Sequence, residues 1–347
     1  MKMLSLNEIG IIPAKISQIR SRSEVNPYVE GDKLPIFVSP MTCIINEDNF
    51  EEFKNSKFIP ICPIRANRDV NSLFLNDGNW YAVTMKEFRE YFVEMVMPIT
   101  DSYKILIDVA DGHMQELYNM VRQAKAIYPD LTVMVGNIAN PETYIDCCKA
   151  RVDYVRVGIG GGKGCLTSVL TGIHASLAWL LTSINEIKSC MTEYETYGSI
   201  NYARPSLYEG INGFRTKVIA DGGIDTIDKI IKCLALGADY VMLGKMIAEC
   251  DINGGDIIYY ADGRKARIYY GQASRYGQID RFGEIKSEPE GTEVKVEVNT
   301  TLEELANKIS AIMRSAMSYC NAKNLDEFIG KPRYECMSYA EFNEYKK

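Results

Sequence analysis

The stretch KVIADGGIDTIDKIIKCLALGADYVMLG, residues 217–244, decides the fold. Two short apolar runs, at 217–223 and 239–244, flank a segment in which apolar residues recur at helical spacing. Gly237 stands where a helix of this length would end, and glycine is common at that position. The stretch therefore predicts a strand, a helix over 225–238 and a second strand, which form one βαβ unit of a parallel sheet.

The same alternation runs through the rest of the chain. Six further apolar runs have the length and β-branched composition of strands: PIFVS (35–39), FIPIC (58–62), YAVTM (81–85), KILIDVA (104–110), TVMVG (132–136) and YVRVG (154–158). Several are apolar on both faces, as in a parallel sheet that is buried on both sides. Eight strands alternating with helices predict an α/β fold of the (β/α)8 TIM-barrel type. An open doubly wound sheet is the alternative, but the even repetition favours a closed barrel.

Helical periodicity marks two further segments. MQELYNMVRQAKAIYP, at 114–129, is amphipathic and follows a predicted strand. TTLEELANKISAIMRSAMSYC, at 300–320, repeats apolar residues at helical spacing, and Thr300-Thr301-Leu302-Glu303 predicts a capping box at its start.

Two regions lie outside the simple alternation of a single barrel domain over 1–347. Residues 180–213 are longer than one crossover helix and rich in Tyr, Asn, Ser and Gly, so we expect an insertion between the sixth and seventh strands. Residues 253–300 begin with a predicted hairpin that has Asp262-Gly263 at its turn. The polar stretch that follows in this region, at 275–291, predicts a mobile flap.

Composition excludes several classes of function. The net charge is -7 and no block of Lys and Arg occurs, so a nucleic-acid partner is not expected. No apolar run is long enough to span a bilayer, and the first residues lack the apolar core of a signal peptide, so we expect a cytoplasmic protein without a membrane partner. The 10 cysteines are scattered, which is typical of reduced thiols. The 2 histidines, His113 and His174, do not suit a histidine-rich metal site.

A cysteine follows a dense run of glycines in VGIGGGKGCLTSVLTG, residues 157–172. Five of the seven residues from Gly158 to Gly164 are glycine, a density that indicates a backbone lying close to a ligand. Cys165, at the end of the run, is either a nucleophile aimed at that ligand or a small buried residue.

Two more glycine-bearing turns follow the last two predicted strands. In a (β/α)8 barrel, ligands bind at the carboxyl ends of the strands, and the loops after strands seven and eight commonly hold phosphate. Asp221-Gly222-Gly223-Ile224 follows the seventh strand, and Gly244-Lys245 follows the eighth. Because backbone amides in such turns attract anions, we expect a phosphorylated ligand among the three loops, with Cys165 facing its reactive end. A tight strand-to-helix turn is the alternative for each loop taken alone.

These motifs occur in a recognisable order. The order is IDVADGH (107–113), GNIA (136–139), VGIGGGKGCLT (157–167), VIADGGI (218–224), DYVMLG (239–244), YYGQAS (269–274) and PEG (289–291). Together they resemble the IMP dehydrogenase/GMP reductase family, as do LPIFVSPMT (34–42) and SAMSYCNAKNLDEF (315–328). The resemblance implies a (β/α)8 barrel, usually a homotetramer, that binds a purine mononucleotide and a nicotinamide cofactor. The CBS pair of most IMP dehydrogenases has no room here, because only residues 63–80 separate the second and third strands.

The resemblance gives the central chemistry to Cys165. In the family this thiolate adds to C2 of the purine ring, and a hydride passes between C2 and nicotinamide. The covalent adduct is resolved by water in the dehydrogenase or by release of ammonia in the reductase. Thr167 and Arg281 are the other implied catalytic residues.

The resemblance also implies ligands for each bound group. For the nucleotide these are Asp221 at the ribose hydroxyls, Gly222, Gly223 and Gly244 at the 5′-phosphate with a hydroxyl from Tyr269 or Tyr270, Gly271 and Gln272 beside the base, and Glu290 at its N1/N2 edge. For the cofactor, NAD or NADP, they are Asp108 beside the nicotinamide ribose, Asn137 near the reacting ring, and Gly158. The carbonyls of Gly160 and Gly162 are the implied ligands of a K+ ion.

Two lysines depart from the family pattern. Lys163 stands where the phosphate loop usually has Ser, and Lys245 stands where it has Ser or Gly. Their charges would strengthen phosphate binding or replace the monovalent cation, so both are candidate substrate-binding residues. Solvated surface lysines are the alternative.

The choice of reaction depends on how water is activated. Arg275 stands where the reductases have a Glu that pairs with the Thr after the cysteine, which argues against a standard reductase. Arg281-Phe282 is the nearest match to the Arg-Tyr pair of the dehydrogenase flap. We therefore favour an IMP dehydrogenase, which converts IMP, NAD and water to XMP and NADH. The open alternatives are a GMP reductase using NADPH, a catalytically weak purine-nucleotide-binding protein and a flavin-dependent barrel enzyme.

Overall fold

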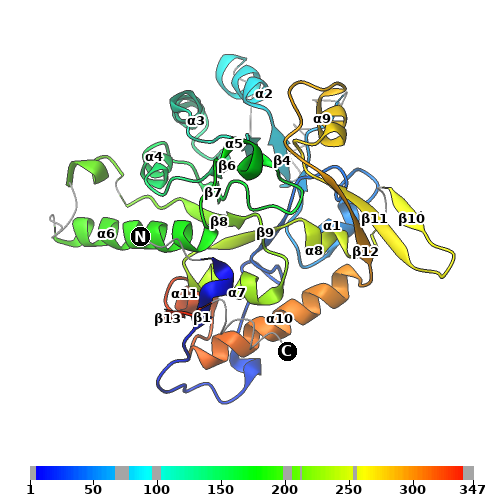
Figure 1. Cartoon of the computed structure of the whole chain (residues 1–347). Helices are drawn as coiled ribbons and strands as arrows, with labels where there is room; N and C mark the ends of the chain where they lie inside the picture. Colours follow the sequence, from blue (N-terminus) through cyan, green and yellow to red (C-terminus); the bar gives the residue numbers. More distant parts are fainter. Residues whose placement is uncertain are drawn as a thin grey trace.

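A barrel of eight parallel strands forms the centre of the computed structural model (Figure 1), which describes residues 5–66, 78–95, 103–197, 205–211, 213–252 and 256–338. The barrel strands are β2 (Ile36–Val38), β3 (Ile61–Cys62), β4 (Trp80–Val83), β5 (Lys104–Asp108), β6 (Thr132–Ile138), β7 (Tyr154–Val157), β8 (Lys217–Asp221) and β9 (Tyr240–Leu243). They pair in the order β2-β9-β8-β7-β6-β5-β4-β3. Phe37 of β2 bridges to Ile59, just ahead of β3, so the two edges of the sheet meet. The predicted (β/α)8 barrel and its eight strands are confirmed.

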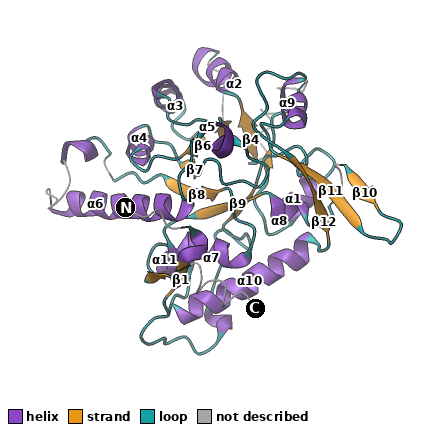
Figure 2. Cartoon of the chain, in the orientation of Figure 1, coloured by secondary structure: helices purple, strands orange, loops and turns teal. Residues whose placement is uncertain are grey.

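Helices connect the strands and lie around the barrel (Figure 2). The α-helices are α1 (Phe50–Asn55), α2 (Met85–Arg89), α3 (Gln115–Ile127), α4 (Thr143–Lys149), α5 (Thr167–Thr171), α6 (Leu177–Tyr197), α7 (Ile227–Ala235), α8 (Lys245–Ala248), α9 (Arg275–Phe282), α10 (Leu302–Tyr319) and α11 (Leu325–Phe328). The 3-10 helices are η1 (Leu6–Glu8), η2 (Arg22–Glu24) and η5 (Pro205–Tyr208), and η4 (Glu90–Glu94) is a π-helix. The helices predicted over 114–129 and 225–238 are confirmed as α3 and α7.

The barrel strands bury both of their faces. Leu106 of β5 packs with Met134 and Ile219 in a cluster that fills the barrel, whereas its neighbours Ile105 and Ile107 belong to the core under the helices. All five side chains are 0% exposed. Successive side chains of a strand face opposite sides, and burying each Leu or Ile contributes about 1.5–3 kcal/mol. A strand in this position must therefore be apolar throughout, which is why the runs are visible in the sequence.

The connection between β7 and β8 holds α6, a helix of 21 residues. The predicted insertion, at 180–213, begins inside this crossover helix. Lys188 of α6 pairs with Asp239 at 2.9 Å, which fixes the helix beside the barrel. Residues 198–204 and 212 of the predicted insertion lie outside the described residues.

A small antiparallel sheet follows β9. Its strands are β10 (Ile257–Tyr259), β11 (Lys265–Tyr270) and β12 (Glu293–Val298), paired in that order. Asp262 and Gly263 lie in the turn between β10 and β11, and Gly263 has a φ of 86° that favours glycine. Helix α9 forms the first half of the segment predicted as a flap, and the third strand, β12, was not predicted. Residues 253–255 lie outside the described residues.

The cap of α10 lies one residue later than predicted. Thr301, and not Thr300, is the first capping residue: its N–H donates to Glu304 Oε2 at 2.9 Å, and its hydroxyl accepts from the Glu304 N–H at 3.2 Å. Thr300 is still part of the extended chain, because its carbonyl accepts from Asp251 at 2.7 Å. The predicted box over Thr300 and Glu303 was wrong, because Thr300 forms a bridge with Cys250 and the helix begins after Thr301.

The first and last strands of the described residues lie together. Strand β1 (Ile9–Ile11) pairs antiparallel with β13 (Tyr334–Cys336), which brings the two ends of the described chain side by side. Across the described ranges, each helix is too short or too polar to cross a membrane.

Candidate active site

The loops after β7 and β8 touch through their backbones. A Cβ on Gly158 would lie 2.1 Å from the backbone oxygen of Asp221, and a Cβ on Gly223 would lie 2.9 Å from that of Gly161. Gly158 and Gly223 also have φ angles of 131° and 75°, which other residues rarely adopt. The glycine density of the two loops is thus explained by their close approach at the carboxyl end of the barrel.

The cysteine loop, residues 158–165, is fixed from a second side by the chain around Gly291. Cys165 forms an isolated antiparallel bridge with Gly291. The N–H of Thr292 donates to the carbonyl of Gly164 at 2.9 Å. Segments more than 120 residues apart in sequence therefore hold the backbone on which the cysteine is placed.

The side chains of Cys165, Thr167 and Glu290 form a hydrogen-bonded chain. The Cys165 thiol donates to Thr167 Oγ1 at 3.3 Å, and the Thr167 hydroxyl donates to Glu290 Oε2 at 2.8 Å. Both hydrogen bonds run in the same direction, from sulfur towards the carboxylate. Because a thiolate and not a thiol is the nucleophile, a path that accepts its proton suits covalent catalysis.

Cys165 is more exposed than most of the other cysteines. Burial raises the pKa of Cys43 to about 11 and that of Cys250 to about 12, so these thiols resist ionisation. Cys147 and Cys233 are fully buried and their pKa values are raised by the same cause. Cys165 is only partly buried and ends the loop that contacts the turn after β8.

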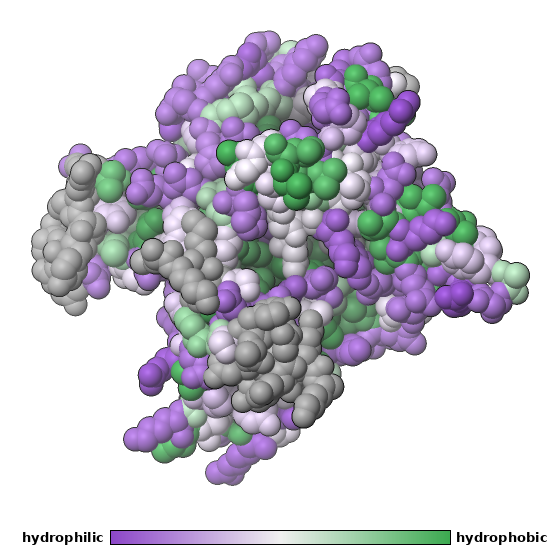
Figure 3. All heavy atoms as spheres, in the orientation of Figure 1, coloured by the Kyte–Doolittle hydropathy of each residue, from purple (hydrophilic) through white to green (hydrophobic). Residues whose placement is uncertain are grey.

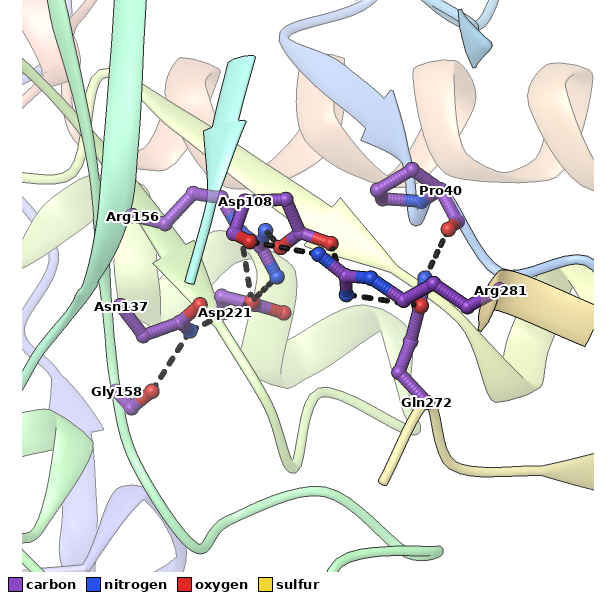
Figure 4. A network of polar contacts seen from close by, with 8 residues as sticks. All are labelled: Pro40, Asp108, Asn137, Arg156, Gly158, Asp221, Gln272 and Arg281. Carbon is purple, nitrogen blue, oxygen red and sulfur yellow. Dashed lines mark hydrogen bonds and ion pairs between the residues drawn. The ribbon is translucent and has the colours of Figure 1, made fainter. Parts of the chain in front are cut away.

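An acidic and basic network lies beside the cysteine loop (Figure 4). Arg156 of β7 donates to Asp221 Oδ2 through Nε at 3.1 Å and Nη2 at 2.9 Å, and to Asp108 Oδ1 through Nη1 at 2.5 Å. Asn137 donates from Nδ2 to Asp221 Oδ2 and to the carbonyl of Gly158, both at 2.8 Å. Arg156 therefore joins Asp221, which the resemblance implies at the ribose of the nucleotide, to Asp108, which it implies at the ribose of the cofactor.

Charge fixes the ionisation of this network. Burial by itself would raise the pKa of Asp108, but the charges of Arg281 and Arg156 outweigh it and lower that pKa. Burial likewise would lower the pKa of Arg156, yet Asp221 and Asp108 raise it overall. Both groups stay charged while they are buried, so the two strand ends are held together by ion pairs.

Arg281 reaches the same network from helix α9. Its Nη1 donates to Asp108 Oδ2 at 2.9 Å, and its Nη2 donates to the Asp108 carbonyl at 2.7 Å. Nη1 also contacts Gln272 Oε1 at 3.3 Å, and the Gln272 amide donates to the carbonyl of Pro40. Arg281, which the resemblance implies in water activation, therefore binds Asp108, which it implies at the nicotinamide ribose.

The structure separates the two candidate phosphate tyrosines. Tyr269 is buried, and its hydroxyl lies 2.7 Å from the position that a Cβ on Gly244 would take. The Tyr270 hydroxyl donates instead to Asp280 Oδ2 at 2.5 Å, where the hydroxyl of Thr42 also donates at 2.6 Å. Tyr269 therefore faces the predicted phosphate turn, whereas Tyr270 ties strand β11 to helix α9.

The two unusual lysines differ in their surroundings. Lys245, in the first turn of α8, forms an ion pair with Glu249 and is partly buried. Lys163 is exposed, and no ion-pair or hydrogen-bond partner for it occurs among the described residues. Lys163 is therefore the less constrained of the two positive charges.

The remaining predicted glycines lie in the same loops. Gly222 has a φ of 91°, and a Cβ on Gly271 would lie 2.7 Å from the carbonyl oxygen of Gly164. The carbonyls of Gly160 and Gly162 accept hydrogen bonds from Ser168 Oγ at 3.3 Å and from the Cys165 N–H at 3.0 Å. Within the described part of the chain, no group of three or more His, Cys, Asp or Glu side chains suits a metal ion.

Sequence reasoning missed Arg156, although a signal was present. YVRVG places one arginine inside an apolar strand that is otherwise buried. A buried charge must be paired, and its partners, Asp108 and Asp221, are the last residues of strands β5 and β8. The sequence has Arg275 where the reductases have the Glu that pairs with this Thr, whereas the structure gives Thr167 an acidic partner from elsewhere, Glu290.

Comparisons with known proteins agree with the barrel and with these loops. A family model described as IMP dehydrogenase / GMP reductase domain matches residues 82–347. The inosine-5′-monophosphate dehydrogenase of Chlorobaculum parvum is 32% identical over 242 residues, which is 66% of this chain but only 44% of that protein. The GMP reductase of Staphylococcus carnosus is 28% identical over 342 residues, and that of Shouchella clausii is 29% identical over 330 residues. The first of these alignments covers 94% of both chains, and the second covers 92% of this chain and 91% of the reductase.

The family match includes every barrel strand from β5 onward and all three glycine-bearing loops. Only residues 63–79 separate β3 from β4, so the chain has no CBS pair at that point. The named relatives on both sides of the family are oxidoreductases. This chain belongs to the IMP dehydrogenase/GMP reductase family.

Proposed function

We propose that this protein oxidises a purine mononucleotide at C2, converting IMP, NAD and water to XMP and NADH. The observation that supports this reaction is the hydrogen-bonded chain from Cys165 through Thr167 to Glu290. The covalent route needs a nucleophilic thiol with a proton acceptor near it, and this chain supplies both. The same observation argues against a protein that binds the nucleotide without turnover.

In this proposal, Asp221 binds the ribose of the nucleotide. The donors from Arg156 and Asn137 all bind Asp221 Oδ2, and no residue in the described ranges donates to Oδ1. The second oxygen is therefore free to accept from the ribose hydroxyls. Because its partner oxygen is held by three donors, the carboxylate is already oriented before the nucleotide arrives.

The 5′-phosphate is proposed to lie between the turns after β8 and β9. The backbone amides of Gly223 and Gly244 supply donors without a side chain in the way. The Tyr269 hydroxyl, beside Gly244, supplies a further donor. Lys163 is the free positive charge nearest in sequence to the cysteine, and we propose that it adds a long-range attraction for the phosphate.

The first chemical step begins with the thiol proton. Cys165 passes this proton through the Thr167 hydroxyl to Glu290, and the thiolate forms a bond to C2 of the purine. When bound, NAD would supply the acceptor for the hydride that leaves C2. The purine is then held to Cys165 through a thioimidate, with C2 oxidised by two electrons.

Water resolves the covalent intermediate in the second step. Glu290 first releases the thiol proton to solvent. Thr167 then accepts a hydrogen bond from the water while donating to Glu290, so the same chain removes the water proton as the water attacks C2. The bond between C2 and the Cys165 sulfur then breaks, and XMP leaves. Arg281 is held by Asp108, so we propose that Glu290 and not Arg281 receives the proton.

A GMP reductase is the second candidate, and a specific observation favours it. The alignment with the Staphylococcus carnosus GMP reductase covers 94% of both chains. In that reaction Glu290 would deliver a proton through the Thr167 hydroxyl to the departing ammonia, and NADPH would be the hydride donor. Glu290 then takes the place of the glutamate that Arg275 replaces.

The test follows reduced nicotinamide by its absorbance in two reactions, IMP with NAD and GMP with NADPH. We expect absorbance to rise in the first reaction and to remain unchanged in the Cys165→Ala protein. A fall in the second reaction alone would establish the reductase instead. No change in either reaction, with the nucleotide still bound in a calorimeter, would contradict both enzymes, and a bound yellow flavin would point to the other class of barrel.

Assembly and location are further parts of the proposal. Val169, Leu170 and Ile173, on α5 and just after it, are 78%, 57% and 57% exposed, and Figure 3 shows a hydrophobic patch there. Exposed apolar patches often mark protein contacts, which supports the homotetramer that the resemblance implies. The 10 free cysteines support a reducing, cytoplasmic location.

A further inference from the structure

Each alternate carbonyl of the cysteine loop has its own hydrogen-bond donor. The Gly160 carbonyl accepts from Ser168 Oγ at 3.3 Å, and the Gly162 carbonyl accepts from the Cys165 N–H at 3.0 Å. The Gly164 carbonyl accepts from the Thr292 N–H at 2.9 Å. Each of the three carbonyls therefore already accepts one hydrogen bond from within the protein.

These contacts conflict with a K+ ion on the same carbonyls. A cation held by backbone oxygens needs several of them aimed at one point, so that they replace its hydration shell. Each of these oxygens instead accepts a bond from its own O–H or N–H, whose hydrogen carries partial positive charge. The carbonyls of Gly160 and Gly162 thus do not fit the cation that the family resemblance implies.

The positive charge of the cysteine loop also disfavours a bound cation. Lys163 is the only charged residue from 157 to 172. It is exposed, and no partner neutralises it among the described residues. A second positive charge bound beside it would be repelled.

Ser168 is the contact in this set that belongs to a side chain. A Cβ on Gly160 would lie 2.8 Å from the Ser168 Cβ, so the loop and the first turn of α5 are in close contact. Because α5 begins two residues after the nucleophile, a bond from Ser168 back to Gly160 closes the loop around Cys165. Loss of the hydroxyl would free the Gly160 carbonyl without changing the backbone.

We propose that Ser168 is a positioning residue that closes the cysteine loop in place of a bound monovalent cation, so that the protein needs no K+. The inference rests on the proposed function for the role of the loop. The test of the Ser168 proposal does not require turnover. Failure of that proposal can therefore be told from failure of the proposed reaction.

The experiment measures the rate at which iodoacetamide alkylates Cys165, read by mass spectrometry of the peptide that contains it. Each protein is assayed in potassium chloride and in choline chloride at equal ionic strength. The proteins are the native chain, Ser168→Ala, Ser168→Thr and Ser189→Ala. Ser189 is a matched control because its hydroxyl also donates to a backbone carbonyl, that of Asn185 at 3.0 Å, on the remote helix α6.

For the native chain we expect the two salts to give rates within about twofold, as matched screening predicts. For Ser168→Ala we expect the rate in choline to rise about fivefold or more, and potassium to restore it, because coupling between a bound ion and a loop is typically of that size. Ser168→Thr and Ser189→Ala should behave like the native chain.

Two results would overturn the proposal. One is a saturable potassium effect of about fivefold or more on the native chain, which would show a working cation site. The other is Ser168→Ala behaving like Ser189→Ala in both salts, or reacting faster with no response to potassium. If Ser168→Ala fails to fold, as judged by its circular dichroism, the native chain in the two salts decides the question alone.

Discussion

Thr167 and Glu290 are 123 positions apart in the sequence and are joined by a hydrogen bond of 2.8 Å between Oγ1 and Oε2. The bond links helix α5, which follows the cysteine, to the chain that leads into β12. It turns a threonine, which is a poor proton acceptor alone, into one end of a path to a carboxylate. The proposed chemistry depends on this pair, and its consequences can be measured separately.

Removing the Thr167 hydroxyl should slow turnover without unfolding the protein. Thr167→Val keeps the side-chain volume but ends the path from Cys165 to Glu290. Positioned proton transfer is typically worth about 10²–10⁴-fold, so we expect kcat to fall by about that factor. Steady-state kinetics with the nucleotide saturating measures it. Thr167→Ser should recover most of the rate, and a fully active Thr167→Val would rule the pathway out.

The two tyrosines of β11 should respond differently to loss of their hydroxyls. Tyr269 faces the predicted phosphate turn, so Tyr269→Phe should weaken nucleotide binding by about 1.5–3 kcal/mol, the range for a hydrogen bond to a charged group. Tyr270→Phe should leave the dissociation constant nearly unchanged, because its hydroxyl is used by Asp280. Calorimetric titration of both variants compares them directly. The reverse order of effects would place the phosphate elsewhere.

Arg156 should contribute strongly to stability. Arg156→Gln leaves the buried carboxylates of Asp108 and Asp221 short of a positive partner, and breaking a buried pair in this way costs about 3–5 kcal/mol. The free energy of unfolding in urea measures the loss. Arg264 is the matched control, because the side chains of its ion pair with Asp262 are 62% and 54% exposed. Arg264→Gln should cost less than about 1 kcal/mol, and equal losses in the two variants would contradict this account.

Acid should remove the contribution of Asp108. The folded-state pKa of Asp108 is lowered because Arg281 and Arg156 outweigh the effect of burial. A lowered pKa means that the stabilisation is present above the unfolded value, about 3.9, and is lost as the pH falls through the folded value. The difference in the free energy of unfolding between the native chain and Asp108→Asn should therefore be largest near pH 7. It should shrink as the pH falls through the folded-state pKa of Asp108.

Denaturation at a series of pH values follows this convergence. Asp130→Asn, at an exposed position, provides the comparison and should show little difference from the native chain at any pH. A gap between the native chain and Asp108→Asn that widened on acidification would mean that burial, and not the two arginines, sets the ionisation of Asp108.

The barrel could be predicted from sequence because its strands are buried on both sides. Ile105, Leu106 and Ile107 leave no polar position in the run, so each strand appears as a short apolar block. Strand β12 was missed for the opposite reason. Its sequence EVKVEV alternates charged and apolar residues and follows a polar segment, and its pairing with β11 is a long-range event.

The site was predictable in part. Glycines that mark close backbone approach and the cysteine beside them are local signals, and Gly158 and Gly223 do lie where other residues would clash. The partners of side chains are not local. Nothing in the sequence says that Thr167 meets Glu290, or that Tyr270 turns to Asp280, because these pairs depend on how α9 and β12 fold back over the barrel.

The most direct test of the central claim is to trap the purine on Cys165. The protein is mixed with IMP and NAD, quenched in acid during turnover, and digested for mass spectrometry. The account predicts that the peptide containing Cys165 gains the mass of the oxidised nucleotide. Turnover with no adduct on Cys165, or an adduct on another cysteine, would contradict the account.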